Sequence, residues 1–302
     1  RIVPGKGNVV ARALLKRARV LKAIASGTLA DKPRPATTIR RMVPMEQRGG
    51  WTYDGSENDP VEHGTIDYIS SESVSANPVG FRSAYMDWGR PTIIAAGKGL
   101  LDSWRAMEGG WSKTNLTSSP RGEKIVGVAK TPYGAGVGHN TVKMALREFI
   151  EQHMSSTAAT EHPHYVFESI ASELKEETHV GGFRITSDYM VPPALSAPKE
   201  WLAQAEDPVQ NFYLGSKGSG SHLHNHAGAF NVLVYGRKRW ILIPPEYGML
   251  FNARELGMMA MPVQDFLKHA LPKLTSEADG LEPIQFVQQA GEIVYVPCDW
   301  QH

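Results

Sequence analysis

Short apolar segments separated by turn residues dominate the second half of the chain, whereas the first eighty residues contain few. Runs of β-branched and aromatic residues bounded by Gly, Pro or Asn are typical of strands. On this basis we predict strands over residues 90–96, 124–129, 165–168, 211–214, 230–235, 239–243, 284–287 and 292–296. So many short strands predict a mainly β domain with a few flanking helices.

Helical periodicity is found in three segments. The apolar residues of 142–153 recur on one helical face, at Val142, Ala145, Leu146, Phe149 and Ile150. A second helix is expected around residues 263–271. Residues 10–24 form a basic amphipathic pattern without an acidic residue, typical of a targeting segment or a surface-binding helix. A solvated helix packed on the domain is the alternative for this third segment.

Charge divides the 302-residue chain into unequal parts. Residues 1–50 carry 12 Lys or Arg against two acidic residues, so the remaining residues carry a net negative charge within a total of +1. We therefore predict a basic N-terminal arm over 1–50, a linker-like arm over 51–84 and a folded domain over 85–302. The basic arm could contact nucleic acid, but it lacks the interleaved aromatic residues on which bases stack.

Composition excludes several classes of protein. No apolar run approaches the ~20 residues of a membrane-spanning helix. The single cysteine, Cys298, excludes a framework of intramolecular disulfides and a cysteine-rich zinc site. A hydrophobic fraction of 41% is enough for a sizeable core.

Three histidines at two-residue intervals are the strongest chemical signal. His222, His224 and His226 follow a Gly-rich segment and precede an apolar strand. Side chains at i and i+2 of extended chain share a face, so two of these imidazoles can reach one metal ion. Both His222 with His224 and His224 with His226 are sterically allowed, so His224 is common to both choices. Three neutral imidazoles suit Fe(II), Zn(II) or Cu(II) on ligand softness alone.

Lys238 is the second candidate site residue. Continued alternation from Val232 and Val234 predicts that Lys238 points inward, where an unpaired ammonium group is unfavourable and requires an anionic partner. The distal carboxylate of a small dicarboxylic acid would serve. A surface basic cluster is the alternative. Asn231 and Ser221 lie near the same site in the sequence and could bind the same ligand.

Two segments resemble the Jumonji-C branch of the cupin superfamily. The first is Gly-x-Gly-x-x-x-His-x-His, ending at His226, with Tyr-Gly-Arg-Lys-Arg-Trp and Pro-Pro-Glu following it up to residue 246. The second is Ala-Gly-Glu-Ile-Val-Tyr-Val-Pro-Cys-Asp-Trp-Gln-His over residues 290–302. The resemblance covers roughly residues 85–302. Within that branch the chain is most similar to the jumonji domain-containing protein 8 group, which also has His-x-His.

This resemblance implies a double-stranded β-helix, the cupin or jelly-roll barrel, that holds Fe(II) and 2-oxoglutarate. It implies an oxygenase that hydroxylates a protein side chain or demethylates lysine. His224, His226 and His302 match the metal ligands in the ungapped alignment, and a gapped alignment would choose His222 and His224. Lys238 matches the lysine that binds the 2-oxoglutarate 5-carboxylate. By position, Asn231 and Ser221 match groups that hydrogen-bond the cosubstrate.

Two departures from the family pattern lead to an alternative function. The usual carboxylate ligand is replaced by histidine, and we expect the strand that normally follows the last ligand to be truncated. The alternative is therefore a catalytically inactive scaffold for protein interaction that retains a metal. The resemblance points to a protein substrate or partner and offers the endoplasmic reticulum lumen as one location, without excluding other organelles, the cytoplasm or the nucleus.

Overall fold

A computed structural model describes residues 49–51, 66–95, 97, 104, 106–130, 141–154, 163–169, 211–248, 261–277 and 282–302. The predicted basic arm and its helix over 10–24 lie outside the described residues. Within the described part the fold is mixed α and β, with strands in three sheets. Closure of these strands into one barrel is not seen among the described residues. No helix in these ranges is both long and apolar enough to cross a membrane.

The central sheet has four strands. Its order is β1 (Asp67–Ser70), β2 (Thr92–Ala95), β10 (Glu292–Val296) and β7 (Ala229–Val232). β1 and β2 are parallel, whereas β10 is antiparallel to both of its neighbours. Because β10 is buried at every position, it forms the middle of this core. β1 lies upstream of residue 85, where we placed the beginning of the folded domain, so the fold includes residues from the segment interpreted as a linker.

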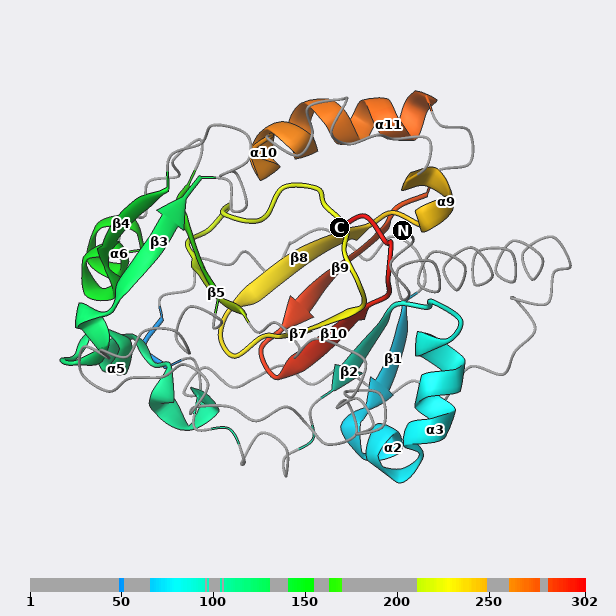
Figure 1. Ribbon diagram of the computed structural model, residues 1–302, viewed down its shortest axis with the longest axis horizontal. Helices are drawn as coiled ribbons and strands as arrows, with labels where there is room; N and C mark the ends of the chain where they lie inside the picture. Colours follow the sequence, from blue (N-terminus) through cyan, green and yellow to red (C-terminus); the bar gives the residue numbers. More distant parts are fainter. Residues whose placement is uncertain are drawn as a thin grey trace, which may run out of the picture.

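Two further sheets surround this centre (Figure 1). One has the order β4 (Val142–Ala145), β3 (Ile125–Ala129), β5 (Tyr165–Ser169) and β6 (Asn211–Gly215). The other consists of β8 (Arg237–Leu242) and β9 (Ile284–Gln289), paired antiparallel. The turn between β9 and β10 contains Gly291, whose φ of 84° favours glycine.

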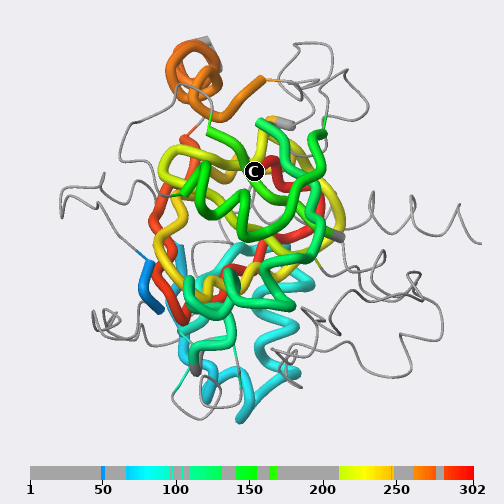
Figure 2. Tube along the Cα trace, turned by 90° about the vertical axis from the view of Figure 1, so that its left-hand side faces the viewer, coloured from blue at the N-terminus to red at the C-terminus, as the bar shows by residue number. Residues whose placement is uncertain are grey.

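Helices cover the sheets on two sides. In Figure 2 the orange helices lie above the strands and the cyan helices below them. The lower group is α2 (Ser71–Ala76), α3 (Pro78–Phe81) and η2 (Arg82–Met86). The upper group is α10 (Val263–Asp265), η10 (Phe266–Ala270) and α11 (Leu271–Glu277). The others are η3 (Ala106–Gly110), α5 (Lys113–Thr117), η4 (Arg121–Glu123), α6 (Leu146–His153) and α9 (Pro245–Gly248).

The central sheet and the β8–β9 sheet share one hydrophobic cluster, which we call the inner cluster. Its buried residues are Tyr68, Ile93, Trp240, Leu242, Phe286, Val294, Val296 and Trp300. The opposite face of the central sheet packs on the cyan helices through Ile293 and Tyr295. Alternate residues of β10 therefore face two different cores, which is why the whole strand is apolar apart from its first residue.

Candidate metal centre

The segment that carries the three neighbouring histidines is an extended loop between β6 and β7 rather than part of a strand. Leu223, 4% exposed, packs with Ile243 and with residues of η10 and α11. Gln264 of α10 donates from Nε2 to the Gly218 carbonyl at 2.8 Å. The upper helices therefore hold the loop on both sides of its glycines, and Leu223 anchors it between His222 and His224.

The C-terminal segment lies alongside this loop (Figure 1). The His224 amide donates to the His302 carbonyl at 3.0 Å, and the His302 amide returns a bond to the His224 carbonyl at 2.8 Å. Asp299 adds a third bond, from its amide to the His226 carbonyl at 3.1 Å. Backbone bonding thus brings residues 224–226 and 302 together, although they are far apart in the sequence.

Three histidines converge at this junction. One ring nitrogen each of His224, His226 and His302 lies within 4.8 Å of those of the other two. The rings of His224 and His302 have centroids 4.3 Å apart, and those of His226 and His302 are 4.7 Å apart. His222 is outside this group, buried with its ring centroid 5.6 Å from that of His224. The geometry favours the pairing of His224 with His226 over the alternative with His222.

Backbone carbonyls orient all three rings. Nδ1 of His224 lies 2.8 Å from the His222 carbonyl, Nδ1 of His226 lies 2.6 Å from that of Ala227, and Nδ1 of His302 lies 3.0 Å from that of Trp300. A carbonyl only accepts, so each Nδ1 carries the hydrogen and each Nε2 is the ring nitrogen whose lone pair a metal ion could accept. This is the tautomer that a metal ligand requires.

Burial keeps two of these rings neutral. Burial is the largest cause that lowers the pKa of His224; the bond to the His222 carbonyl opposes it, and the neighbouring His226, His222 and Lys238 add to it, so that the pKa is about 4. Burial also lowers the pKa of His302 well below its usual value, with His224 as the next cause. Neutral imidazoles do not have to lose a proton before they bind a cation at pH 7. The donor set therefore fits a divalent transition metal.

Lys238 lies on the interior face of β8. It shares that face with Trp240 and Leu242 of the inner cluster, as alternation along the strand requires. Burial lowers the pKa of Lys238 to about 8, and no carboxylate among the described residues opposes that shift. Lys238 thus faces inward, as alternation predicts. Val232, which was expected to share its face, does not. Val232 ends β7 and packs against the opposite face of the central sheet.

Asn231 and Ser221 are the two further predicted site residues. Asn231 pairs with Val294 across β7 and β10, so the two side chains point to the same side, toward the β8–β9 sheet. The Oγ of Ser221 is buried and has no hydrogen-bond partner among the described residues. Both remain predicted cosubstrate contacts.

A buried polar network beside the site was missed by the sequence interpretation. Gln288 is 0% exposed and pairs with Lys238 across β8 and β9. It accepts from Trp240 and donates to two backbone carbonyls. Glu292 is 3% exposed and accepts from the Tyr68 hydroxyl at 2.9 Å. No local sequence pattern predicts the role of Gln288. Trp240 follows Lys238 by two residues, and this spacing in a strand predicts that the two side chains share a face.

Fold and site together define a member of the cupin-like class: the Cupin-like domain profile matches residues 78–302, and the chain belongs to that family. The bifunctional arginine demethylase and lysyl-hydroxylase psr-1 of Caenorhabditis briggsae is 26% identical over 272 residues, 86% of this chain and 64% of that protein. JmjC domain-containing protein 8 of Mus musculus is 34% identical over 106 residues, 35% of this chain and 36% of that protein.

A plant protein is similar to this chain over a comparably long stretch. Arginine-specific demethylase JMJ22 of Arabidopsis thaliana is 27% identical over 229 residues, 74% of this chain and 40% of that protein. The chain therefore spans less than two thirds of the length of each of these relatives. These identities of 26% to 34% show a shared family and do not assign the activity of any one relative to this chain.

Proposed function

We propose that this protein is an Fe(II)- and 2-oxoglutarate-dependent oxygenase that hydroxylates or demethylates a protein side chain. The observation that carries the proposal is the convergence of three imidazoles, each with Nδ1 bonded to a carbonyl. Three protein ligands leave coordination positions open, as catalytic metal sites require. The relatives psr-1, a bifunctional arginine demethylase and lysyl-hydroxylase, and JMJ22, an arginine-specific demethylase, support the same class of reaction. A double-stranded β-helix is the proposed architecture.

Each candidate site residue would have a separate role in binding the metal or the cosubstrate. His224, His226 and His302 would hold the metal, and their carbonyl partners would keep the rings aimed at one point. The Lys238 ammonium group would bind the distal carboxylate of 2-oxoglutarate through a charge-assisted hydrogen bond. Ser221 and Asn231 would orient the same molecule. Iron bound there would supply O2 activation coupled to decarboxylation of 2-oxoglutarate to succinate.

One feature favours a second candidate, a metal-holding scaffold without turnover. The three ligands are neutral, so a bound divalent ion keeps one more unit of positive charge than in a site with a carboxylate ligand. The ion would then hold anions more tightly than an ion in a site with a carboxylate ligand, and a non-reacting anion could occupy the open positions.

A single experiment separates the two candidates. The full-length protein is loaded anaerobically with Fe(II), and binding of 2-oxoglutarate is measured before O2 is admitted and succinate is quantified. An oxygenase is expected to bind Fe(II) and 2-oxoglutarate and to form succinate. The His302→Ala variant, which lacks one ligand, is expected neither to bind these ligands nor to form succinate. Binding of metal without succinate would favour the scaffold. Failure of the wild-type protein to bind either Fe(II) or 2-oxoglutarate would rule out the oxygenase.

A further inference from the structure

Two aromatic rings hold the Lys238 ammonium group. Its Nζ lies 4.6 Å from the ring centroid of Trp240 and 5.1 Å from that of Tyr213. Tyr213 belongs to β6 and Trp240 to β8, so the lysine lies between two different sheets. Ring faces attract a cation through their quadrupole but do not neutralise it. The ammonium group is therefore placed without losing its capacity to bind an anion.

The Trp240 ring is itself fixed by a hydrogen bond at its edge. Its Nε1 donates to Oε1 of Gln288 at 2.9 Å. Gln288 donates in turn from Nε2 to the Asn231 carbonyl at 3.0 Å and to the Glu292 carbonyl at 2.8 Å. The side-chain amide thus links β8 to β7 and β10 through β9, and it prevents the indole from turning in the inner cluster.

The same ring lies next to a candidate metal ligand. The centroids of Trp240 and His302 are 6.0 Å apart, with the ring planes inclined by 32°. One indole therefore contacts the candidate anion-binding lysine on one side and neighbours the metal-binding group on another. The relative placement of those two groups determines which length of dicarboxylic acid can reach both.

We propose that Trp240, held by Gln288, is the positioning residue that presents the Lys238 ammonium group to the distal carboxylate of a dicarboxylic acid. This inference rests on the proposed function, because it concerns the cosubstrate of the same site. It assigns Trp240 no contact with the reacting atoms. Its effect passes through Lys238 and is confined to ligands that carry the distal carboxylate.

The expected effect of removing the ring follows from the strength of the cation–aromatic contact. A desolvated contact of this kind corresponds to a change of roughly thirtyfold in affinity. In Trp240→Leu, the affinity for 2-oxoglutarate should fall by about that factor. The affinity for 2-oxopentanoate should stay within about twofold of wild type, because this monocarboxylate has the same carbon chain and no distal carboxylate. Trp240→Phe keeps a ring face but loses the hydrogen bond to Gln288, so it should recover only part of the loss.

The test is anaerobic titration calorimetry with both oxo acids on the full-length protein loaded with Fe(II), carried out on wild type, Trp240→Leu, Trp240→Phe and a control variant. Trp111→Leu is the matched control: it removes a second tryptophan that lies edge-to-face with Phe212, 5.1 Å away, beside a different cluster. This control should leave both affinities unchanged. Equal losses for both oxo acids in Trp240→Leu would show a merely structural role and would overturn the inference.

A second measurement does not depend on the folding of a tryptophan variant. In the wild-type protein, the methylene protons next to Lys238 Nζ should be shifted upfield by the two rings, with the resonance assigned by its loss in Lys238→Arg. An unshifted resonance would overturn the inference. If the wild-type protein binds 2-oxoglutarate but Trp240→Leu binds it equally well, the inference alone fails. If the wild-type protein binds neither oxo acid, the proposed function fails and the inference falls with it.

Discussion

At the scale of single residues, the expected binding of an anion depends on the ammonium group of Lys238. Among the described residues, Lys238 has aromatic rings as its neighbours and no carboxylate, and burial lowers its pKa to about 8. Because its usual value is 10.5, the folded protein releases this proton more readily than the unfolded chain does. The charge state of the candidate anion-binding group is therefore sensitive to pH in a range that is easy to reach.

We expect the affinity for 2-oxoglutarate to fall as pH rises through about 8, by roughly tenfold per unit above it, because the ammonium form binds the carboxylate. Lys238→Arg should abolish this fall, since a guanidinium group remains charged. Calorimetric titration at pH 7, 8, 9 and 10 measures both proteins. A wild-type affinity that is constant up to pH 10 would contradict the assignment.

The same shift has a defined consequence for folding stability. Between pH 8 and 10.5 the unfolded chain binds the Lys238 proton and the folded protein does not. The contribution of this group to the free energy of unfolding therefore rises with pH across that window. Comparison of urea unfolding of the wild-type protein with Lys238→Met, which cannot titrate, isolates the contribution.

At the scale of elements, tertiary pairing overrode local periodicity in two places. Residues 142–153 show one helical face, yet the helix α6 begins at Leu146 and the four preceding residues form β4. β4 pairs with β3, with Ile125 opposite Ala145, and hydrogen bonds to a neighbouring strand are not visible in a one-dimensional pattern. Likewise β7 ends at Val232 and β8 begins at Arg237. Gly236, with φ of 85°, lies in the connection.

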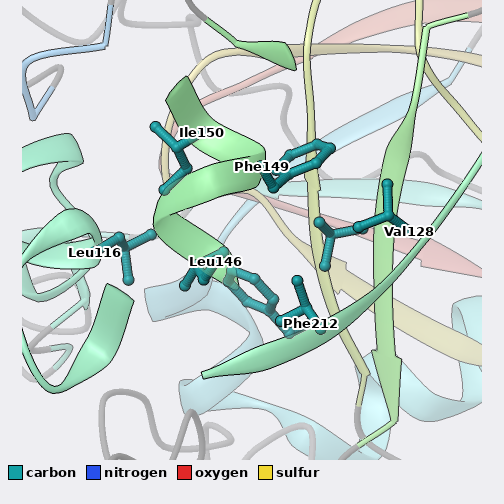
Figure 3. Close-up of a cluster of buried hydrophobic side chains, with 8 residues drawn as sticks. Leu116, Val128, Leu146, Phe149, Ile150 and Phe212 are labelled. Carbon is teal, nitrogen blue, oxygen red and sulfur yellow. The ribbon is translucent and has the colours of Figure 1, made fainter. Parts of the chain in front are cut away.

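The predicted face of α6 is nevertheless the face that packs. Figure 3 shows Leu146, Phe149 and Ile150 pointing from the helix toward Leu116, Val128 and Phe212, and all six belong to one buried cluster. This cluster fills the space beside the β4-β3-β5-β6 sheet, which contributes Tyr213 to the site. Stability of α6 therefore supports the sheet that carries one of the two rings.

Phe149→Ala should lower the free energy of unfolding by about 3–5 kcal/mol, because Phe149 is 0% exposed and its removal leaves a cavity. The control is Glu151→Ala on the exposed face of the same helix, which should change the free energy by less than about 0.5 kcal/mol. Urea unfolding followed by circular dichroism measures both. Similar values for the two variants would show that α6 does not depend on this cluster.

At the scale of the whole molecule, the candidate site is a junction between distant parts of the chain. Two of its histidines lie on the loop before β7, and the third lies at residue 302 on the C-terminal segment. Backbone bonds between His224 and His302 close this junction. A metal held by all three would bind the folded state and not the unfolded chain, so it would stabilise the fold.

Saturation with Zn(II) at about 100 times its dissociation constant should stabilise the protein by about 2.7 kcal/mol, which raises Tm by roughly 5 °C. A chelator should reverse the increase, and His302→Ala should remove it. His222→Gln should retain it, because His222 lies outside the converging group. Scanning calorimetry with and without the metal measures the wild type, these two variants and His226→Gln. Loss of the increase in His222→Gln with retention in His226→Gln would support the alternative pair.

The spacing of histidines and the alternation of apolar residues determined a good part of this protein without any structure. They are sufficient to select His222, His224 and His226 as candidate ligands and to predict an inward Lys238, because side-chain direction in extended chain has a period of two. His302 was added as the third ligand by the resemblance to the Jumonji-C branch. Only tertiary structure separated His222 from that group, ended β7 at Val232 and placed β1 in the central sheet. It also brought Trp240, Tyr213 and Gln288 around the lysine. These outcomes depend on contacts between segments far apart in the chain, which no local pattern of residues encodes.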